Sequence, residues 1–243
     1  MFSTSFMSNQ TFAFKQFKII QDKCAMKVGT DAVLLGSWVN SSNAKTILDI
    51  GTGTGIISLM LAQKSGARID AIDIDLNAFI QATENVNNCK WKDYIEVHHI
   101  SLQQFAKESD HKYDLIVSNP PYFVDSSKAS EESRTNARHT DQLPFKDLLN
   151  GVLKLLNPNG KFYVILPTKE SELFRDNAEK NKLFLTKVTR VITRTDKPEK
   201  RLLMRFEFIQ RAFSEDSITI EKDERHSYTD EYKELTKDYY LAF

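Results

Sequence analysis

The sequence predicts an α/β protein with a Rossmann-like, doubly wound sheet of about seven strands, mostly parallel with an antiparallel last strand. Three observations support this prediction. Short apolar runs alternate with segments of helical periodicity, which is typical of a parallel sheet with helices on both faces. A glycine-rich turn follows the first apolar run. The last two predicted strands are joined by a turn too short for a crossover helix, so one of them runs antiparallel to its neighbour.

We predict a single domain over residues 1–243, in which residues 1–43 form an N-terminal extension that packs near the ligand site. The extension contains a hairpin or loop and then a helix over 31–38, capped by Thr30 or Asp31. Apolar runs predict strands at 46–50, 68–72, 95–100, 113–118, 160–166, 185–193 and 202–210. Helical patterns predict helices at 56–64, 76–87, 145–156 and 169–180, and an amphipathic terminal helix within 228–241.

Composition is that of a globular protein, with 41% apolar and 27% charged residues. No apolar stretch reaches membrane-spanning length, and the N-terminus does not resemble a signal peptide. Cys24 and Cys89 lie far apart, which fits a reducing compartment, so we expect a cytoplasmic protein. The histidines show no metal-ligand spacing. We therefore expect a monomer that needs no metal and binds no membrane.

The formal net charge is zero, but the charges are segregated. Residues 180–205 contain nine basic and two acidic side chains, whereas residues 211–243 contain five basic and nine acidic ones. A local basic surface of this kind is suited to phosphate groups, although a solvated strand and turn explain the count about equally well.

A glycine-rich turn, Gly51-Thr52-Gly53-Thr54-Gly55, follows Asp49 at the end of the first long strand. Glycines at alternate positions let the backbone approach a ligand, although a tight turn in an unrelated fold has the same pattern. The spacing lacks the third glycine of dinucleotide-binding loops. Asp73 ends the second strand 24 residues later (73 − 49), where a carboxylate can accept both hydroxyls of a ribose. Together these features disfavour hydride transfer but retain a nucleoside-containing cofactor, and we expect Asp75 to cap the next helix.

The motif Asn119-Pro120-Pro121-Tyr122 directly follows the strand at 113–118. Two successive prolines end the strand in a stiff turn at the sheet edge where open α/β sheets bind ligands. The turn presents an amide, a rigid carbonyl and an aromatic ring together. These groups suit a planar molecule that carries an exocyclic amino group.

This combination resembles the class I S-adenosylmethionine-dependent methyltransferases. The resemblance implies cofactor binding by Asp49, Gly51, Gly53, Gly55, Asp73 and Ser101, with Gln103 as an alternative to Ser101. It implies catalytic roles for Asn119, Pro120 and Tyr122, with Pro121 and Phe123 beside the substrate. The resemblance also implies that the substrate's amino group is conjugated to a planar system. The motif is shared by enzymes that methylate adenine and by enzymes that methylate a protein glutamine.

The flanking residues resemble the bacterial valine tRNA adenine-N6 methyltransferases, which modify adenine 37 beside the anticodon. The similarity covers residues 14–17, 21–36, Arg134-x-x-Ala137-Arg138-His139 and 239–241. It implies that Lys27 and Thr30 lie at the methionine end of the cofactor. We expect a tRNA anticodon stem-loop to contact Arg134, Arg138, Arg194, Lys197, Lys200 and Arg201. The alternatives are an N5-glutamine methyltransferase acting on a protein such as a release factor, and a cofactor-binding RNA module without activity.

Overall fold

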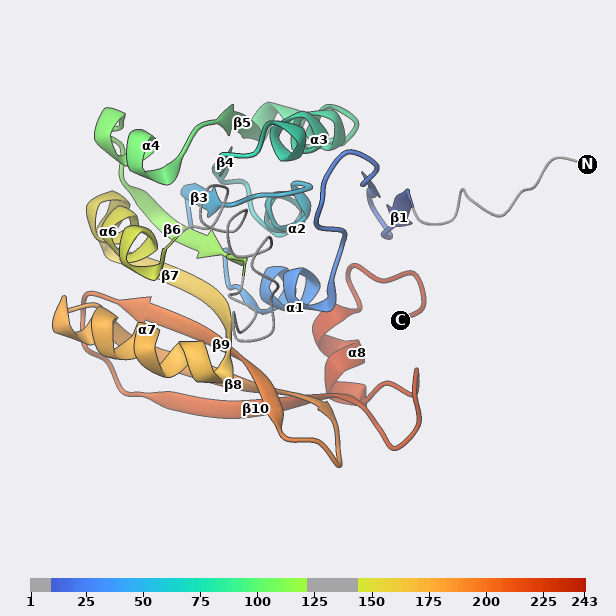
Figure 1. The fold of residues 1–243 in the computed structure, drawn as a ribbon. Helices are drawn as coiled ribbons and strands as arrows, with labels where there is room; N and C mark the ends of the chain where they lie inside the picture. The colour runs from blue at the N-terminus through green and yellow to red at the C-terminus, as the bar shows by residue number, and fades with distance from the viewer. Residues whose placement is uncertain (1–9, 122–143) are drawn as a thin grey trace, which may run out of the picture.

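The computed structural model describes residues 10–121 and 144–243. A mixed sheet of eight strands runs through the protein, with helices on both faces (Figure 1). Its strands, in chain order, are β3 (Thr46–Ile50), β4 (Arg68–Asp73), β5 (Ile95–His99), β6 (Tyr113–Ser118), β7 (Leu156–Pro167), β8 (Phe184–Arg194), β9 (Glu199–Glu207) and β10 (Ser214–Glu221). The order across the sheet is β10-β8-β9-β7-β6-β3-β4-β5. The predicted α/β class with a mostly parallel sheet is therefore confirmed.

The helices are α1 (Thr30–Trp38), α2 (Ile56–Lys64), α3 (Leu76–Asn87), α4 (Leu102–Glu108), α6 (Phe145–Leu155), α7 (Thr168–Lys180) and α8 (Asp230–Thr236). A short 3-10 turn, η1 (Lys92–Tyr94), precedes β5, and a separate hairpin of β1 (Thr11–Ala13) and β2 (Lys18–Ile20) lies near the N-terminus. No helix among these described residues has the length and apolar content needed to cross a membrane.

The two faces of the sheet bury separate cores, as the alternation of side chains along a strand requires. On β7, Tyr163 and Ile165 join the core under α1, α2 and α8, whereas Phe162 and Val164 join the core under α4, α6 and α7. All of these side chains are almost fully buried. Strands that are buried on both faces have continuous apolar sequences, which explains why the positions of these strands could be predicted.

The predicted last strand corresponds to β9, which is antiparallel to both of its neighbours, as expected. The sequence did not predict β10, which follows it and pairs parallel with β8 at the edge of the sheet. The first half of β10 is exposed and polar, so its sequence resembles an acidic tail. The short helix α4 was also missed, because only Leu102 and Ala106 of its seven residues are buried.

The predicted cap of the first helix was wrong. Gly29 occupies the N-cap position of α1, and no side chain caps this helix end. Asp31 instead pairs with Arg201 of β9, with 2.9 Å between Oδ2 and Nε. A partner 170 positions away in the sequence cannot be inferred from local capping patterns.

The two described ends of the chain pack against each other. Tyr239 donates from its hydroxyl to the Met60 carbonyl of α2, and its own carbonyl accepts from the Lys15 backbone N–H at 2.8 Å. The Phe14 ring stacks on both Phe17 and Tyr240. This aromatic cluster anchors the β1–β2 hairpin to the body of the protein.

Candidate functional site

The carboxyl ends of β6, β3 and β4 meet at one edge of the sheet. Ile50 is in register with Ser118 on one side and with Ile72 on the other, so the residues that follow these three strands become neighbours. A cavity of about 420 Å³ opens there. Seven of the residues expected to bind cofactor or substrate line it: Gly51, Gly53, Asp73, Ser101, Asn119, Pro120 and Pro121.

The glycine loop after β3 needs its glycines because of the backbone conformation. Gly51, Gly53 and Gly55 have φ of 71°, 58° and 80°, which L side chains rarely adopt. A Cβ on Gly51 or Gly53 would meet no atom within 4 Å, so the loop presents an open backbone cradle. Gly55 serves packing instead, because its Cβ position lies 3.4 Å from Ala82 of α3. The open cradle fits the amino-acid end of a nucleoside cofactor.

Asp49 does not line the cavity and lies beneath the loop, where it is fully buried. Its Oδ2 accepts hydrogen bonds from the hydroxyls of Thr52 and Ser58, each at 2.7 Å. Burial raises the pKa of this carboxyl to about 6, although both hydroxyls lower it. The geometry makes Asp49 a tether between the glycine loop and α2.

Asp73 faces the cavity and also binds the backbone beside it. Its Oδ2 accepts from the Gly53 N–H at 2.8 Å, and its Oδ1 accepts from the Asp75 N–H at 3.0 Å. Burial raises the pKa of Asp73 above its ordinary value, and the backbone hydrogen bonds oppose this rise. Asp75 caps α3 through the Ala78 N–H, which confirms the prediction for that residue.

Ser101 and Gln103 both reach the cavity at the end of β5. Ser101 is the N-cap of α4, because its hydroxyl accepts from the Gln104 N–H at 3.2 Å. The Gln103 side-chain amide donates to Asp147 of α6 at 3.0 Å. Ser101 therefore has a structural role that the missed helix α4 explains.

The Asn119–Pro121 turn begins at the end of β6. Ser118 is fully buried and donates from its hydroxyl to the Ile50 carbonyl at 3.0 Å, which ties β6 to β3. Asn119 and Pro121 are half-buried, and Pro120 is buried. The remaining expected residues of this region, Tyr122, Phe123, Arg134 and Arg138, lie outside the described residues.

The N-terminal extension was expected near this site, but the three of its residues that line the cavity were not predicted. Cys24, Ala25 and Met26, from the segment between β2 and α1, lie against the same space as Asp73. Lys27 and Thr30, which were expected near the cofactor, are exposed and are not among the lining residues. The resemblance of residues 21–36 pointed to this segment, but the residues that turn toward the cavity depend on its folded path.

The basic hairpin of β8 and β9 lies at this same edge of the sheet, but its charges are largely paired. Arg194 and Lys197 share Asp196, and Arg201 binds Asp31. Arg190 lies between Glu199 and Glu215, and Lys187 pairs with Asp216 at 3.2 Å. Carboxylates of the unpredicted β10 thus pair with Lys187 and Arg190, and Asp196, Glu199 and Asp31 supply the other partners.

A second cavity, of about 590 Å³, opens at the opposite end of β4 and β5. Asp70, Glu96 and His98 lie there with ligand-type atoms within 4.8 Å of one another, a grouping that their sequence spacing did not reveal. Asp70 already accepts from the Tyr113 hydroxyl at 2.6 Å and contacts His98 Nε2 at 2.9 Å. These hydrogen bonds account for the cluster as part of the packing between β4, β5 and β6.

Comparison with known proteins is consistent with this geometry. Residues 24–172 match the family model described as the methyltransferase small domain. The chain is 46% identical to the tRNA1(Val) (adenine(37)-N6)-methyltransferase of Bacteroides fragilis over 97% of its own length and 99% of that protein. It is 46% identical to the protein of the same name from Trichodesmium erythraeum over 98% and 100% of the two chains.

Solved structures share the fold at low identity. A predicted O-methyltransferase from Agrobacterium tumefaciens matches with a TM-score of 0.69 and 17% identity, over 86% of this chain and 96% of that one. TrmK of M. capricolum, solved with S-adenosylhomocysteine, matches with a TM-score of 0.52 and 15% identity, over 78% and 71% of the two chains.

Proposed function

Since this chain belongs to the methyltransferase small-domain family and groups there with the tRNA1(Val) (adenine(37)-N6)-methyltransferases, we propose that its catalytic turn acts on N6 of adenine 37 in valine tRNA. The methyl donor is S-adenosylmethionine. One observation carries the proposal: a single cavity joins the glycine loop, Asp73 and the Asn119–Pro121 turn. Donor-binding and acceptor-binding groups therefore face the same space.

The cavity residues fit such a donor. The open backbone of Gly51 and Gly53 would hold its amino-acid end, and Asp73 would accept hydrogen bonds from its ribose. Ser101 and Gln103 lie where the adenine end would follow. When bound, S-adenosylmethionine supplies an electrophilic methyl group.

The turn itself supplies orientation and charge stabilisation. The side-chain oxygen of Asn119 and the carbonyl of Pro120 would accept the two N6–H bonds of the target adenine. This holds the nitrogen in line for attack and stabilises the positive charge that grows on it. The methylated nitrogen is acidic and releases its proton without a strong protein base, so Asn119 needs no partner that titrates.

The substrate is suited to this edge of the sheet. A base in an anticodon loop is unpaired, so turning it into a pocket costs less than extruding it from a duplex. We place Tyr122 and Phe123 beside the adenine, and Arg134, Arg138, Arg194, Lys197, Lys200 and Arg201 along the stem-loop. Lys27 and Thr30 remain proposed contributors at the cofactor. We further propose that the protein works as a monomer in the cytoplasm and needs no metal.

Methyl transfer from labelled S-adenosylmethionine to unmodified valine tRNA tests the proposal. We expect incorporation that disappears when adenine 37 is replaced by guanine. Asn119→Ala should lower kcat by about 100-fold or more, because a preorganised acceptor of the transition-state charge is lost. Asn181→Ala is the matched control, since this exposed amide at the end of α7 bonds only to Asn177 within its own helix.

Transfer to a release-factor glutamine but not to RNA would overturn the proposal in favour of the protein-modifying alternative. Cofactor binding without transfer to either substrate would favour the binding module. The 46% identity to two tRNA-modifying proteins makes the RNA substrate the better supported choice.

A further inference from the structure

The segment that lines the cavity, Gln21–Val28, is held in place by side chains rather than by the sheet. This wall segment connects β2 to α1 and contributes Cys24, Ala25 and Met26 to the cavity. Its two ends are drawn together by Gln21, whose side-chain oxygen accepts from the Val28 N–H at 2.8 Å. Apart from the bond from the Gln21 backbone N–H to the Gln10 carbonyl at 2.8 Å, the segment pairs with no strand among the described residues, so its position depends largely on such side-chain contacts.

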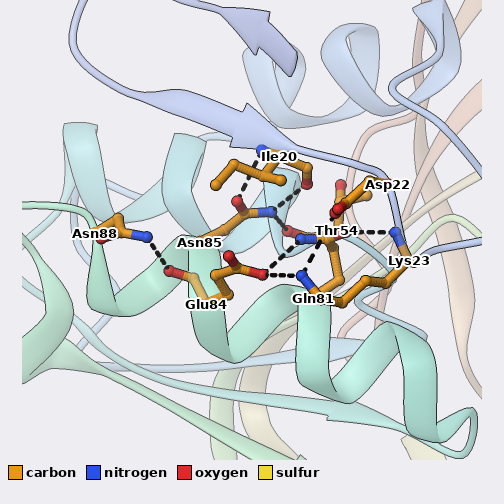
Figure 2. Close-up of polar contacts among 8 residues, drawn as sticks. All are labelled: Ile20, Asp22, Lys23, Thr54, Gln81, Glu84, Asn85 and Asn88. Carbon is orange, nitrogen blue, oxygen red and sulfur yellow. Dashed lines mark hydrogen bonds and ion pairs between the residues drawn. The ribbon is translucent and has the colours of Figure 1, made fainter. Parts of the chain in front are cut away.

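Two buried amides of α3 bind the chain here (Figure 2): Asn85 binds Ile20, the residue directly before the segment, and Gln81 binds Lys23 within it. Asn85, only 1% exposed, accepts from the Ile20 N–H and donates to the Ile20 carbonyl, both at 2.8 Å. It thereby pairs with the end of β2 as another peptide group would. Gln81, which is fully buried, accepts from the Lys23 N–H at 2.9 Å.

Asn85 also reaches the glycine loop. Its Nδ2 donates to the Thr54 carbonyl at 2.8 Å, so one side chain bonds to both the wall segment's anchor and the loop expected to hold the cofactor (Figure 2). Nearby, the Cβ position of Gly55 lies 3.4 Å from Ala82, one turn earlier on α3. Helix α3 is therefore the common support of two cavity walls that are distant in sequence.

We infer that Asn85, assisted by Gln81, is a positioning residue for cofactor binding: it locks the Gln21–Val28 wall to the glycine loop, and cofactor affinity depends on this lock. The inference rests on the proposed function for the identity of the ligand. Only protein in which the wall segment is closed binds the cofactor. The apparent dissociation constant therefore rises by the same factor by which the fraction of closed protein falls. Phe14 and Phe17 anchor the turn of the β1–β2 hairpin separately, so loss of Asn85 frees Ile20 and the wall segment that follows it without releasing the rest of the hairpin.

Asn85→Asp is the principal test. The introduced carboxylate is isosteric and can still accept from Ile20, but it faces the Ile20 and Thr54 carbonyls without a donor. We expect S-adenosylhomocysteine to bind at least about tenfold more weakly, whereas kcat at saturating S-adenosylmethionine stays within about threefold of wild type. Trypsin should cleave faster after Lys23 or Lys27 in the unliganded variant.

Asn88→Asp is the matched control. Asn88 is the C-cap of α3 and is exposed, and its side-chain amide donates to the Glu84 carbonyl of the same helix at 2.9 Å (Figure 2). We expect its binding and proteolysis to match wild type. A pH series of binding, with the urea midpoint measured at each pH, separates loss of the lock from general destabilisation, because destabilisation alone leaves the affinity of the folded fraction unchanged. As the pH falls from about 8 to about 5.5, the introduced carboxyl group of Asn85→Asp becomes neutral and regains a donor, so its binding defect relative to wild type should shrink.

If Asn85→Asp does not fold, Gln81→Met replaces it, because this substitution leaves the Lys23 N–H without its acceptor at similar side-chain volume. Wild-type affinity for S-adenosylhomocysteine in the folded variant would overturn the inference, as would an equal defect in Asn88→Asp. Wild-type protein that binds S-adenosylhomocysteine but methylates no tRNA would instead refute the proposed function alone.

Discussion

The Asp73 carboxylate accepts a hydrogen bond from the Gly53 backbone N–H, with 2.8 Å between Oδ2 and nitrogen. The residue expected to hold the ribose thus also holds the loop expected to hold the amino-acid end of the cofactor. Both ends of the expected ligand site thus depend on one half-buried carboxylate.

Asp73→Ala should therefore impair binding through both roles. It removes the acceptor for the Gly53 and Asp75 N–H groups as well as the ribose contact. We expect S-adenosylhomocysteine to bind about 100-fold more weakly by calorimetry, and the free energy of unfolding to fall by about 1–3 kcal/mol. Asp73→Asn, which keeps one acceptor oxygen, should lie between Ala and wild type. Asp176→Ala on the exposed face of α7 serves as the control, and equal affinities for all variants would contradict the dual role.

Asp49 should make stability depend on pH in an unusual direction. Its pKa is about 6 in the folded protein and near 3.8 in the unfolded chain, so between these values only the unfolded chain loses the proton. The penalty for ionising the buried carboxyl therefore grows as pH rises from about 4 to about 6 and then stays constant, at roughly 3 kcal/mol.

Asn lacks this titration, so the unfolding free energy of Asp49→Asn minus that of wild type should increase over the same interval and then level off. Urea denaturation at several pH values measures this difference. Asp110→Asn, at an exposed loop position, should show a flat difference. A flat difference for Asp49→Asn as well would show that the buried carboxyl does not carry the penalty.

Lys200 provides a test of the basic hairpin. It is the second residue of β9, next to Arg201, which is in register with Pro167 at the carboxyl end of β7. Strand β9 lies two strands, or about 10 Å across the sheet, from β6, which carries the Asn119–Pro121 turn. Among residues 10–121 and 144–243, no ion pair involves the Lys200 ammonium group, whereas the Arg194 guanidinium and the Lys197 ammonium group both pair with Asp196. Lys200→Ala should weaken tRNA binding and reduce the slope of log K against log salt by about 1, as expected for one lost phosphate contact.

Lys112→Ala is the matching control for that experiment. Lys112 precedes β6 and bonds to the Lys154 carbonyl, so it lies at the edge of the sheet opposite the cavity. Its slope should equal that of wild type. Identical salt slopes for Lys112→Ala and Lys200→Ala would show that Lys200 does not contact the RNA.

Local sequence signals were sufficient for the central sheet. The runs at 46–50 and 113–118 match β3 and β6, because strands buried on both faces are continuous apolar segments ended by glycine or proline. The convergence of Gly51, Asp73 and Asn119 on one cavity also follows from parallel strands sharing an edge.

Long-range contacts explain what the sequence did not show. The ion pair between Asp31 and Arg201 displaced the expected helix cap, and the path of Cys24 into the cavity depends on Asn85 and Gln81 of a later helix. The basic surface was overestimated for a similar reason. Two of its neutralising partners, Glu215 and Asp216, belong to a strand whose pairing no local pattern predicts, and a third, Asp31, lies in a distant helix.

The strand β10 also affects how copies of this protein behave toward each other in solution. Without it, β8 would present an open edge containing Val188 and Val191, to which strands of another molecule could add. With it, the outermost strand begins with the exposed polar run Ser214-Glu215-Asp216-Ser217, which offers no apolar side chain to a strand of another molecule. Removal of β10, which resembles an acidic tail in the sequence, should therefore expose the β8 edge and make the protein prone to self-association.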